Sequence, residues 1–401
     1  MNLAWEEFRR VDRAAVFKKG LRAAELRREP HGIELRYDEE YLGSSGAALA
    51  STLPLRREPY VTPAGALPPY LSGLLPEGRR LSALRRAVKT SADDELSLLL
   101  AVGADAIGDI QVVPAGASPE EVSPRVEFKR WQDVSFAEVF SAETGAEPDR
   151  VALPGVQPKA SARMISLPVR SGSGRFILKL DPPEYPHLCR NEWLMLQAAA
   201  TSGLYTASTE LVVDRDGHEA LAVSRFDRTS DGGLLAVEDA CQALGRYPAD
   251  KYNLTTEEAG SALSALGDAP LAVARTLLRW VAFAYLTGNG DLHAKNLAVA
   301  ERPDGLVQAA PAFDLPSSYP YGDVTMALPI GGKSREDIGR ADLITLASAW
   351  GVPQRAAAKV LDDLVDRADA WLPRLDESGF PQRTVAKWRR AVGYRRKRLA
   401  G

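Results

Sequence analysis

The order of secondary-structure patterns in the middle of the chain is the feature that most constrains its fold. Two strand-like runs flank the turn sequence SGSG and predict a hairpin over 162–181, because glycine relieves the steric limits on positive φ. A helical pattern over 187–203 follows, and a second hairpin over 209–226 turns at DRDG. Beyond Glu238 most of the chain has helical periodicity, interrupted by short strand patterns. The sequence therefore predicts an α+β fold in which a lobe of hairpins precedes a mostly helical lobe.

The 401 residues exceed what one hydrophobic core usually supports, so we expect several domains. The strand-like runs VFKKG, GIELRYD and STLPL predict a small α+β module at the N-terminus. The segment KTSADDELSLLLAVG predicts its closing helix, with Thr90 or Ser91 as N-cap and Gly103 as the stop. The next segment, 114–128, is rich in Pro, Ser and Glu and has no apolar periodicity, which indicates a linker. The predicted divisions are the module 1–113, the linker 114–135, the hairpin lobe 136–228 and the helical lobe 229–401.

Composition excludes several classes of protein. Fifty Lys and Arg against 53 Asp and Glu give a formal charge of −3, which does not favour a chain that binds nucleic acid directly. Cys189 and Cys241 have no metal-ligand spacing, so neither a disulfide framework nor a zinc site is expected. The first twenty residues lack the apolar core of an export signal, and the apolar run 271–287 carries two arginines and predicts a buried helix. We expect a cytoplasmic protein without a membrane segment.

The run TGNGDLHAKN, Thr287–Asn296, carries the strongest chemical signal. Its D-x-x-x-x-N spacing places Asp291 and Asn296 on one tight loop between a long helix and a short strand. There Asp291 would accept the proton of an attacking hydroxyl, and the amide oxygen of Asn296 would bind Mg²⁺, because hard cations prefer oxygen ligands. Alone, the spacing is common by chance, and Asp291 would then only cap a turn.

A predicted hairpin supports the chemical interpretation of this loop. The strand patterns NLAVA and LVQAA surround an RPDG turn, so PAFDL should return beside the loop and present Asp314 as a second metal ligand. The alternative for Asp314 is a turn residue at the end of a strand. Two oxygen-ligand loops joined by one hairpin favour phosphoryl transfer, which needs bound metal and an oriented hydroxyl. The order of hairpin, helix, hairpin and helical body is also that of a two-lobed kinase.

The cation that phosphoryl transfer requires has a candidate in the first hairpin. Lys179 lies in FILKLD on the opposite strand face from Phe176, Leu178 and Leu180. Glu192 on the following helix could pair with it, as kinases use such an ion pair to hold a lysine on the nucleotide phosphates. Otherwise Lys179 would lie on a solvated face and Glu192 on a helix surface.

Two further segments are candidates for contact with ATP. In LPGVQPK, Gly155 permits close backbone approach and Lys159 adds positive charge for phosphate. In VSRFDR, the backbone near Arg225 and Phe226 could meet the adenine edge where a hinge between the lobes would lie, and Asp227 could reach the ribose. A salt-linked turn is an equally good interpretation of VSRFDR.

Together the motifs GVQPK, ILKL, NEW, RFDR, DLHAKN and FDL resemble the HipA-type serine/threonine kinase toxins, and LSGLLPEG and VGADAIGD resemble the small leading domain of that family. The resemblance implies an ATP- and Mg-dependent kinase that phosphorylates a serine of a translation factor, such as an aminoacyl-tRNA synthetase, and causes growth arrest or persistence. It implies a helix-turn-helix antitoxin (HipB-like) as partner, through which the protein would contact DNA. Its motifs carry over the roles of Asp291, Asn296, Asp314 and Lys179, and add Gln157, Lys159 and His293 on the nucleotide side. His293 could equally be a structural residue of the loop.

The sequence departs from the family at one position. Members usually carry an autophosphorylated serine just before the G-x-Q-x-K segment, but this chain has Ala152-Leu153-Pro154 there. Ser161 is the nearest serine. The departure puts self-inactivation by phosphorylation in doubt.

Two other functions compete with this interpretation. A small-molecule phosphotransferase of the aminoglycoside or choline kinase type has a similar GDLHxxN loop, but would not be expected to carry the leading module or GVQPK. An inactive pseudokinase serving as corepressor would not need the intact Asp, Asn, Asp and Lys set. The basic tail KWRRAVGYRRKRLAG could bind nucleic acid, although such runs are commonly the solvated face of a helix.

Overall fold

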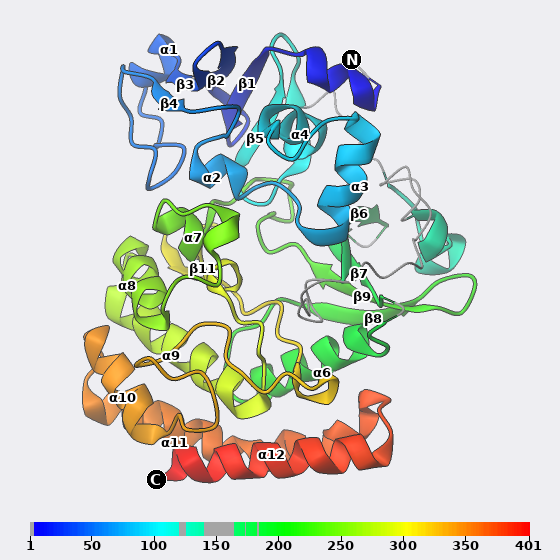
Figure 1. Ribbon diagram of the computed structural model, residues 1–401, viewed down its shortest axis with the longest axis vertical. Helices are drawn as coiled ribbons and strands as arrows, with labels where there is room; N and C mark the ends of the chain where they lie inside the picture. Colours follow the sequence, from blue (N-terminus) through cyan, green and yellow to red (C-terminus); the bar gives the residue numbers. More distant parts are fainter. Residues whose placement is uncertain (1–3, 120–125, 140–163, 173, 183) are drawn as a thin grey trace.

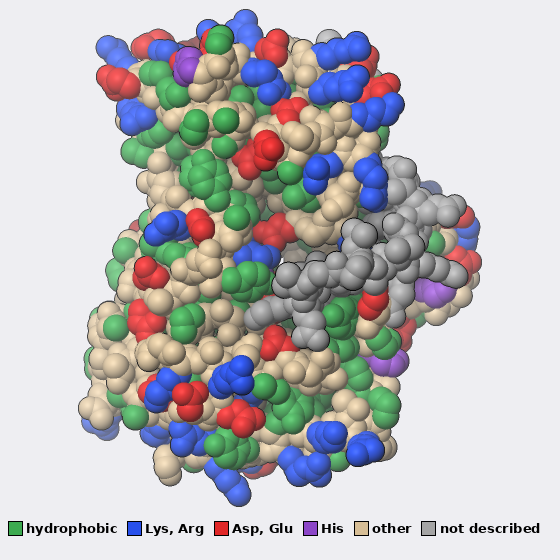
Figure 2. Space-filling view, in the orientation of Figure 1, with side chains coloured by type: hydrophobic (Ala, Val, Ile, Leu, Met, Phe, Trp, Pro, Cys, Tyr) green, Lys and Arg blue, Asp and Glu red, His purple; other side chains and the backbone are tan. Residues whose placement is uncertain are grey.

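A computed structural model of the chain describes residues 4–119, 126–139, 164–172, 174–182 and 184–401 (Figure 1). Three antiparallel sheets and a large helical body make up these residues, which confirms the predicted α+β class. No helix in the described ranges is long and apolar enough to cross a bilayer. On the face seen in Figure 2, basic and acidic side chains are mixed, in keeping with the small net charge.

The N-terminal module is built on a five-stranded sheet in the order β4-β3-β2-β1-β5. Its elements are η1 (Trp5–Arg10), β1 (Arg13–Lys18), β2 (Leu21–Glu29), β3 (Gly32–Tyr37), α1 (Glu39–Leu42), β4 (Tyr60–Thr62), α2 (Pro69–Ser72), α3 (Gly78–Val88), α4 (Glu95–Val102), η2 (Gly103–Asp105) and β5 (Ile110–Pro114). Leucines of α4 and apolar residues of the strands form one buried cluster. This cluster gives the module a core of its own.

Three local predictions for the module were wrong or incomplete. STLPL is not a strand, and β2, β4 and β5 were not predicted. β2 is hard to recognise because it contains charged residues, of which Glu25 is buried and accepts hydrogen bonds from Arg13 at 2.7 and 3.0 Å. The N-cap of α4 is Asp94, whose carboxylate accepts from the N–H of Ser97, rather than Thr90 or Ser91.

The middle part of the chain is a four-stranded sheet backed by one helix. Its elements are η4 (Trp131–Asp133), β6 (Ile165–Ser171), β7 (Gly174–Leu180), α6 (Leu188–Thr201), β8 (Thr209–Val213) and β9 (Glu219–Ser224), with strand order β6-β7-β9-β8. Both predicted hairpins are confirmed, with Ser171 paired to Gly174 in the first and Val213 paired to Glu219 in the second. Phe128 and Trp131, from the segment 114–135, pack with Phe176 on this sheet. The later part of that segment therefore contributes to the sheet's core.

The C-terminal part is mostly helical, as predicted, and contains a small sheet in the order β10-β11-β12, which contacts α7, α8 and α9. Its elements are β10 (Val237–Asp239), α7 (Ala240–Ala243), η6 (Pro248–Asp250), α8 (Thr256–Leu266), α9 (Pro270–Thr287), η7 (Ala294–Asn296), β11 (Ala298–Glu301), β12 (Val307–Ala309), η8 (Tyr319–Tyr321), α10 (Arg340–Ala349), α11 (Gln354–Trp371), η9 (Leu372–Ser378) and α12 (Gln382–Ala400). Helix α9 lies in the core, where Trp280 and Phe283 are fully buried. Its central position fixes the loop that follows its C-terminus.

Candidate active site

Lys179 faces helix α6 because of its register in β7. Leu178 and Leu180 pack into the cluster on one face of the sheet, whereas Lys179 pairs across the backbone with Leu221 of β9 and points to the other face. The residue is 8% exposed. A buried ammonium requires partners, since the desolvation of an unpaired charge is costly.

Two carboxylates supply those partners. The Nζ of Lys179 donates to Oε1 and Oε2 of Glu192 at 2.7 and 2.9 Å, and to Oδ1 of Asp314 at 3.0 Å. Burial alone lowers the pKa of Lys179, but Asp314 and Glu192 outweigh it and raise that pKa above its ordinary value. Burial raises the pKa of Glu192, and the neighbouring ammonium opposes this. The predicted ion pair between Lys179 and Glu192 is confirmed, and it reaches a third charged group.

The loop that carries Asp291 begins where α9 ends. Gly288 has a φ of +78° and caps the helix through its N–H, a conformation that suits glycine. The N–H of Gly290 donates to Oγ of Ser318 at 2.6 Å, and a Cβ on Gly290 would lie 2.7 Å from the carbonyl oxygen of Thr325. Only glycine fits between these neighbours. The GNG sequence thus permits the tight turn that places Asp291 in the site.

Asp291 is buried, with 4% of the residue exposed, and a tyrosine orients its side chain. The hydroxyl of Tyr252 donates to Oδ1 of Asp291 at 2.7 Å, and the Tyr252 ring packs edge-on against His293 at 5.1 Å between centroids. Burial raises the pKa of Tyr252 above its ordinary value, and the Asp291 carboxylate that accepts its hydrogen bond raises it further. The segment that follows Asp314 contacts the same loop, since Oγ of Ser318 accepts from the loop backbone at 2.6 Å.

Asn296 is fixed by the same loop. Its Nδ2 donates to the carbonyl oxygen of Asp291 at 2.9 Å, which leaves the amide oxygen as the atom that can bind a metal ion. The strands β11 and β12 pair antiparallel directly after Asn296, with Val299 opposite Ala309. The predicted hairpin between the two candidate metal ligands is thereby confirmed.

Asp314 adopts a left-handed backbone conformation, with a φ of +53°. Such a conformation costs about 1–3 kcal/mol for a residue with a side chain and persists only where surrounding contacts hold it. The segment after it is anchored to α6, since Asn191 Nδ2 donates to the carbonyl oxygen of Ser317 at 2.8 Å and its Oδ1 accepts from Ser317 N–H at 3.0 Å. The contacts on both sides hold Asp314 where Lys179 can reach it. Its carboxylate, which is 27% exposed, remains accessible to a ligand.

The VSRFDR segment forms the salt-linked turn that was one of its two interpretations. Asp227 is 2% exposed and accepts from Arg225 at 3.0 and 2.6 Å, from Arg228 at 2.8 Å, and from the N–H of Gly108 at 2.9 Å. Burial alone would raise the pKa of Asp227, but the two arginines lower it. Phe226 packs against Phe313, directly before Asp314. The proposed contacts with adenine and ribose stay predictions.

Several other predicted site residues lie in parts of the chain that the structure does not describe. Gly155, Gln157 and Lys159 lie outside the described residues, as do Ala152-Leu153-Pro154 and Ser161. The sequence reading missed the role of Tyr252, which lies in no recognisable motif. The contact of Asn191 with Ser317 was not predicted either, although Asn191 directly precedes the pairing glutamate in the NEW motif.

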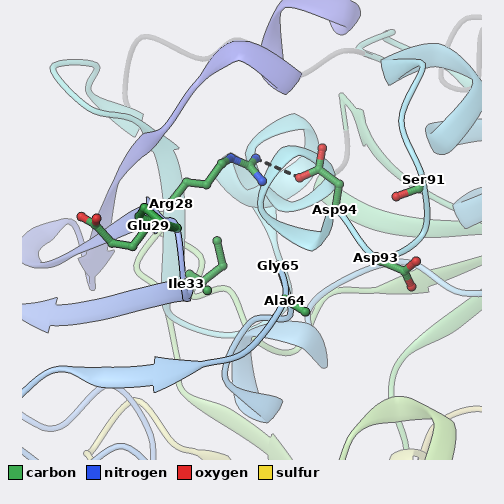
Figure 3. Close-up of a pocket in the computed structure, with 10 residues that line it drawn as sticks. Arg28, Glu29, Ile33, Ala64, Gly65, Ser91, Asp93 and Asp94 are labelled. Atoms are coloured by element: carbon green, nitrogen blue, oxygen red, sulfur yellow. Dashed lines mark hydrogen bonds and ion pairs between the residues drawn. The ribbon is translucent and has the colours of Figure 1, made fainter.

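A separate cavity of about 330 Å³ lies in the N-terminal module (Figure 3). Arg28, Asp93 and Asp94 are among its lining residues, and Arg28 Nη2 donates to Asp94 at 2.9 Å. None of Lys179, Asp291, Asn296 and Asp314 lines it. The phosphoryl-transfer candidates therefore form a distinct site.

Comparison with known proteins shows which proteins share this sequence and fold. The HipA-like C-terminal domain matches residues 151–372 and the HipA N-terminal domain matches residues 14–113. The Sinorhizobium fredii protein Y4mE is 28% identical over 376 residues, covering 88% of this chain and 89% of that protein. The serine/threonine-protein kinase toxin HipA of Shewanella oneidensis is 27% identical over 391 residues, covering 87% and 89%. The solved complex of Shewanella oneidensis HipA with HipB and operator DNA matches the fold with a TM-score of 0.73 at 24% identity, covering 96% of this chain and 97% of the HipA chain.

Proposed function

This chain belongs to the HipA family of serine/threonine protein kinases, and we propose that it is the toxin of a toxin–antitoxin pair. It transfers the γ-phosphate of ATP to a serine of a translation component, such as an aminoacyl-tRNA synthetase, and so causes growth arrest or persistence. The observation that carries the proposal is the contact of Lys179 with both Glu192 and Asp314, since the segment that follows Asp314 is hydrogen-bonded to the loop of Asp291. A buried lysine, a hydroxyl-orienting carboxylate and two oxygen ligands are the parts that phosphoryl transfer requires.

Each residue has a role that follows from its atoms. Lys179, held by Glu192, binds the phosphates of ATP. Asp291 orients the substrate hydroxyl and accepts its proton as the oxygen attacks the γ-phosphorus and the bond to the β-phosphate breaks. Asn296 and Asp314 would hold Mg²⁺, and the oxygen donor set and the accessible Asp314 carboxylate fit that ion. Bound Mg²⁺ would neutralise charge on the phosphate oxygens. Gly155, Gln157, Lys159 and His293 are proposed on the nucleotide side.

We propose that the protein acts in the cytoplasm with a helix-turn-helix antitoxin that neutralises it. The fold match to a HipA–HipB–DNA complex supports this partner, and through the partner an indirect contact with operator DNA. Buried free thiols at Cys189 and Cys241 suit a reducing compartment. Co-purification with a small helix-turn-helix protein encoded beside this gene tests the pairing.

The test of function is phosphorylation by the purified chain with labelled ATP and Mg²⁺. A panel of aminoacyl-tRNA synthetases supplies the expected substrates, and an aminoglycoside and choline supply the competing ones. Label should appear on a synthetase serine and disappear with Asp291→Asn. The matched control is Asp304→Asn, which changes an exposed carboxylate paired with Arg302 in the β11–β12 turn. Label on the small molecules alone, or equal inertness of wild type and Asp291→Asn with antitoxin binding retained, would reject the proposal in favour of the phosphotransferase or the pseudokinase.

A further inference from the structure

The LSGLLPEG segment of the N-terminal module, Leu71–Gly78, lies against the catalytic loop. Lys295, next to Asn296, donates from Nζ to the carbonyl oxygen of Gly73 at 2.8 Å. A Cβ on Gly73 would lie 3.0 Å from Cγ of Gln242, and Gln242 Nε2 donates to the carbonyl oxygen of Tyr70 at 3.0 Å. Figure 1 shows α2 beside α7, the helix that carries Gln242. The absence of a side chain at Gly73 therefore permits close contact between the module and the helical body.

Glu77 uses its side chain across this contact instead of within its own helix. It occupies the N-cap position of α3, yet its carboxylate accepts no capping hydrogen bond there. Its Oε2 pairs with Nζ of Lys251, and its Oε1 lies 3.7 Å from Nζ of Lys295. Both lysine side chains are 13% exposed and that of Glu77 is 35% exposed. One carboxylate of the module thus faces two largely buried cations of the helical body.

Both of these lysines are directly connected to the catalytic loop. Lys295 belongs to the loop itself. The carbonyl oxygen of Lys251 accepts from the N–H of Ala294 at 3.1 Å, and the next residue, Tyr252, donates its hydroxyl to Asp291 at 2.7 Å. The segment Lys251–Tyr252 therefore contacts the loop at two points, and Glu77 contacts that segment.

We propose that Glu77 is a positioning residue, through which the N-terminal module sets the geometry of Asp291 by holding Lys251 and Lys295. The inference rests on the proposed function, since it assigns Asp291 to catalysis. Removing the charge of Glu77 leaves Lys295 with Asp239 at 3.3 Å and with the carbonyl oxygen of Gly73. Lys251 would lose its carboxylate partner in this contact, and the Tyr252 hydroxyl would no longer be held in register with Asp291. Small displacements of a catalytic group reduce the rate strongly, because the reacting atoms must be aligned.

The test compares Glu77→Gln with a matched variant of the same interface. Lys19 of the module pairs with Glu301 of β11 at 2.5 Å, so Glu301→Gln also removes one ion pair between the module and the helical body, but away from the catalytic loop. We expect Glu77→Gln to lower kcat by about 10- to 100-fold with an unchanged KM for ATP, because a misplaced base slows chemistry without weakening nucleotide binding. Glu301→Gln should keep kcat, and the two variants should melt at similar temperatures.

A double-mutant cycle with Tyr252→Phe separates positioning from a general loss of structure. If Glu77 acts through Tyr252, the kcat losses of Glu77→Gln and Tyr252→Phe will not multiply, whereas residues that act independently give multiplicative losses. Equal kcat for Glu77→Gln and Glu301→Gln, or multiplicative losses in the cycle, would overturn the proposal.

Hydrogen exchange of the amides of 289–296 provides a readout that does not need activity. Faster exchange in Glu77→Gln than in Glu301→Gln supports the positioning role, and equal exchange contradicts it. If wild type transfers no phosphate to any substrate, the proposed function fails, while the exchange comparison still decides whether Glu77 holds the loop.

Discussion

The substitution Glu192→Gln tests whether Lys179 is held for ATP or only for stability. Breaking a buried ion pair by removing one partner costs about 3–5 kcal/mol. Here Lys179 keeps Asp314 at 3.0 Å, and glutamine keeps one acceptor oxygen. We therefore expect a smaller loss of unfolding free energy, about 2–3 kcal/mol. The remaining contact draws Lys179 towards Asp314, so both groups become less available to the nucleotide and its metal ion.

The assay is calorimetric titration of MgATP, which requires no protein substrate. We expect the Kd to rise about tenfold, or about 1.4 kcal/mol. The matched control is Asp109→Asn in the N-terminal module, where Asp109 pairs with the buried Lys18 at 2.8 Å. This variant should lose comparable stability and keep the wild-type Kd. If Glu192→Gln loses stability as Asp109→Asn does but binds MgATP as wild type, Lys179 is a structural residue and the reasoning is refuted.

Three further predictions follow from the same geometry. Asp291→Asn should lower kcat by about 10²- to 10⁴-fold, measured by phosphorylation kinetics, because it removes the proton acceptor. The Kd for MgATP, measured by calorimetry, should stay within about twofold, because the phosphate contacts remain. Mg²⁺ with ATP should raise the Tm of wild type more than that of Asp314→Asn, measured by differential scanning fluorimetry, because ligands stabilise only the state they bind. Burial alone would raise the pKa of Asp94, but hydrogen bonds from Ser97, Thr90 and Arg28 lower it below its ordinary value of 3.8. The ionised carboxylate therefore stabilises the fold above pH 3.8, and this stabilisation is lost as the pH falls through the lowered pKa. Urea unfolding should therefore show Asp94→Asn less stable than wild type at neutral pH, with the difference shrinking in acid.

The sequence predicted the structure best where the hydrophobic periodicity of a segment and the residue types in its turns indicate the same element. The strand alternation around Lys179 placed it opposite Leu178, and the glycine turn and helical pattern placed Glu192 on the next element. The hairpin between Asn296 and Asp314 followed from a turn flanked by apolar runs. These parts of the site are specified by residues that are close in sequence.

The missed features depend on contacts between distant segments. Tyr252 reaches Asp291 across 39 positions, and no local pattern marks a tyrosine for that contact. Asp227 was given two interpretations, a ligand of ribose or part of a salt-linked turn; the structure shows the turn and adds a contact with the N–H of Gly108 that no local pattern indicated. A short polar motif can bind a ligand or join two parts of the chain, and only the tertiary structure shows which contact it makes.

The distribution of charge explains why the site binds its lysine so firmly. Glu192 and Asp314 bring two carboxylates against the single ammonium of Lys179. Such an excess of negative charge in a largely buried site favours a divalent cation, whose binding lowers the repulsion among carboxylates. Lys179 offsets only one of the two negative charges, because its ammonium is monovalent. The left-handed backbone at Asp314 is held by the contacts of its neighbours, Phe313 with Phe226 and Ser317 with Asn191, which fix the carboxylate beside Lys179.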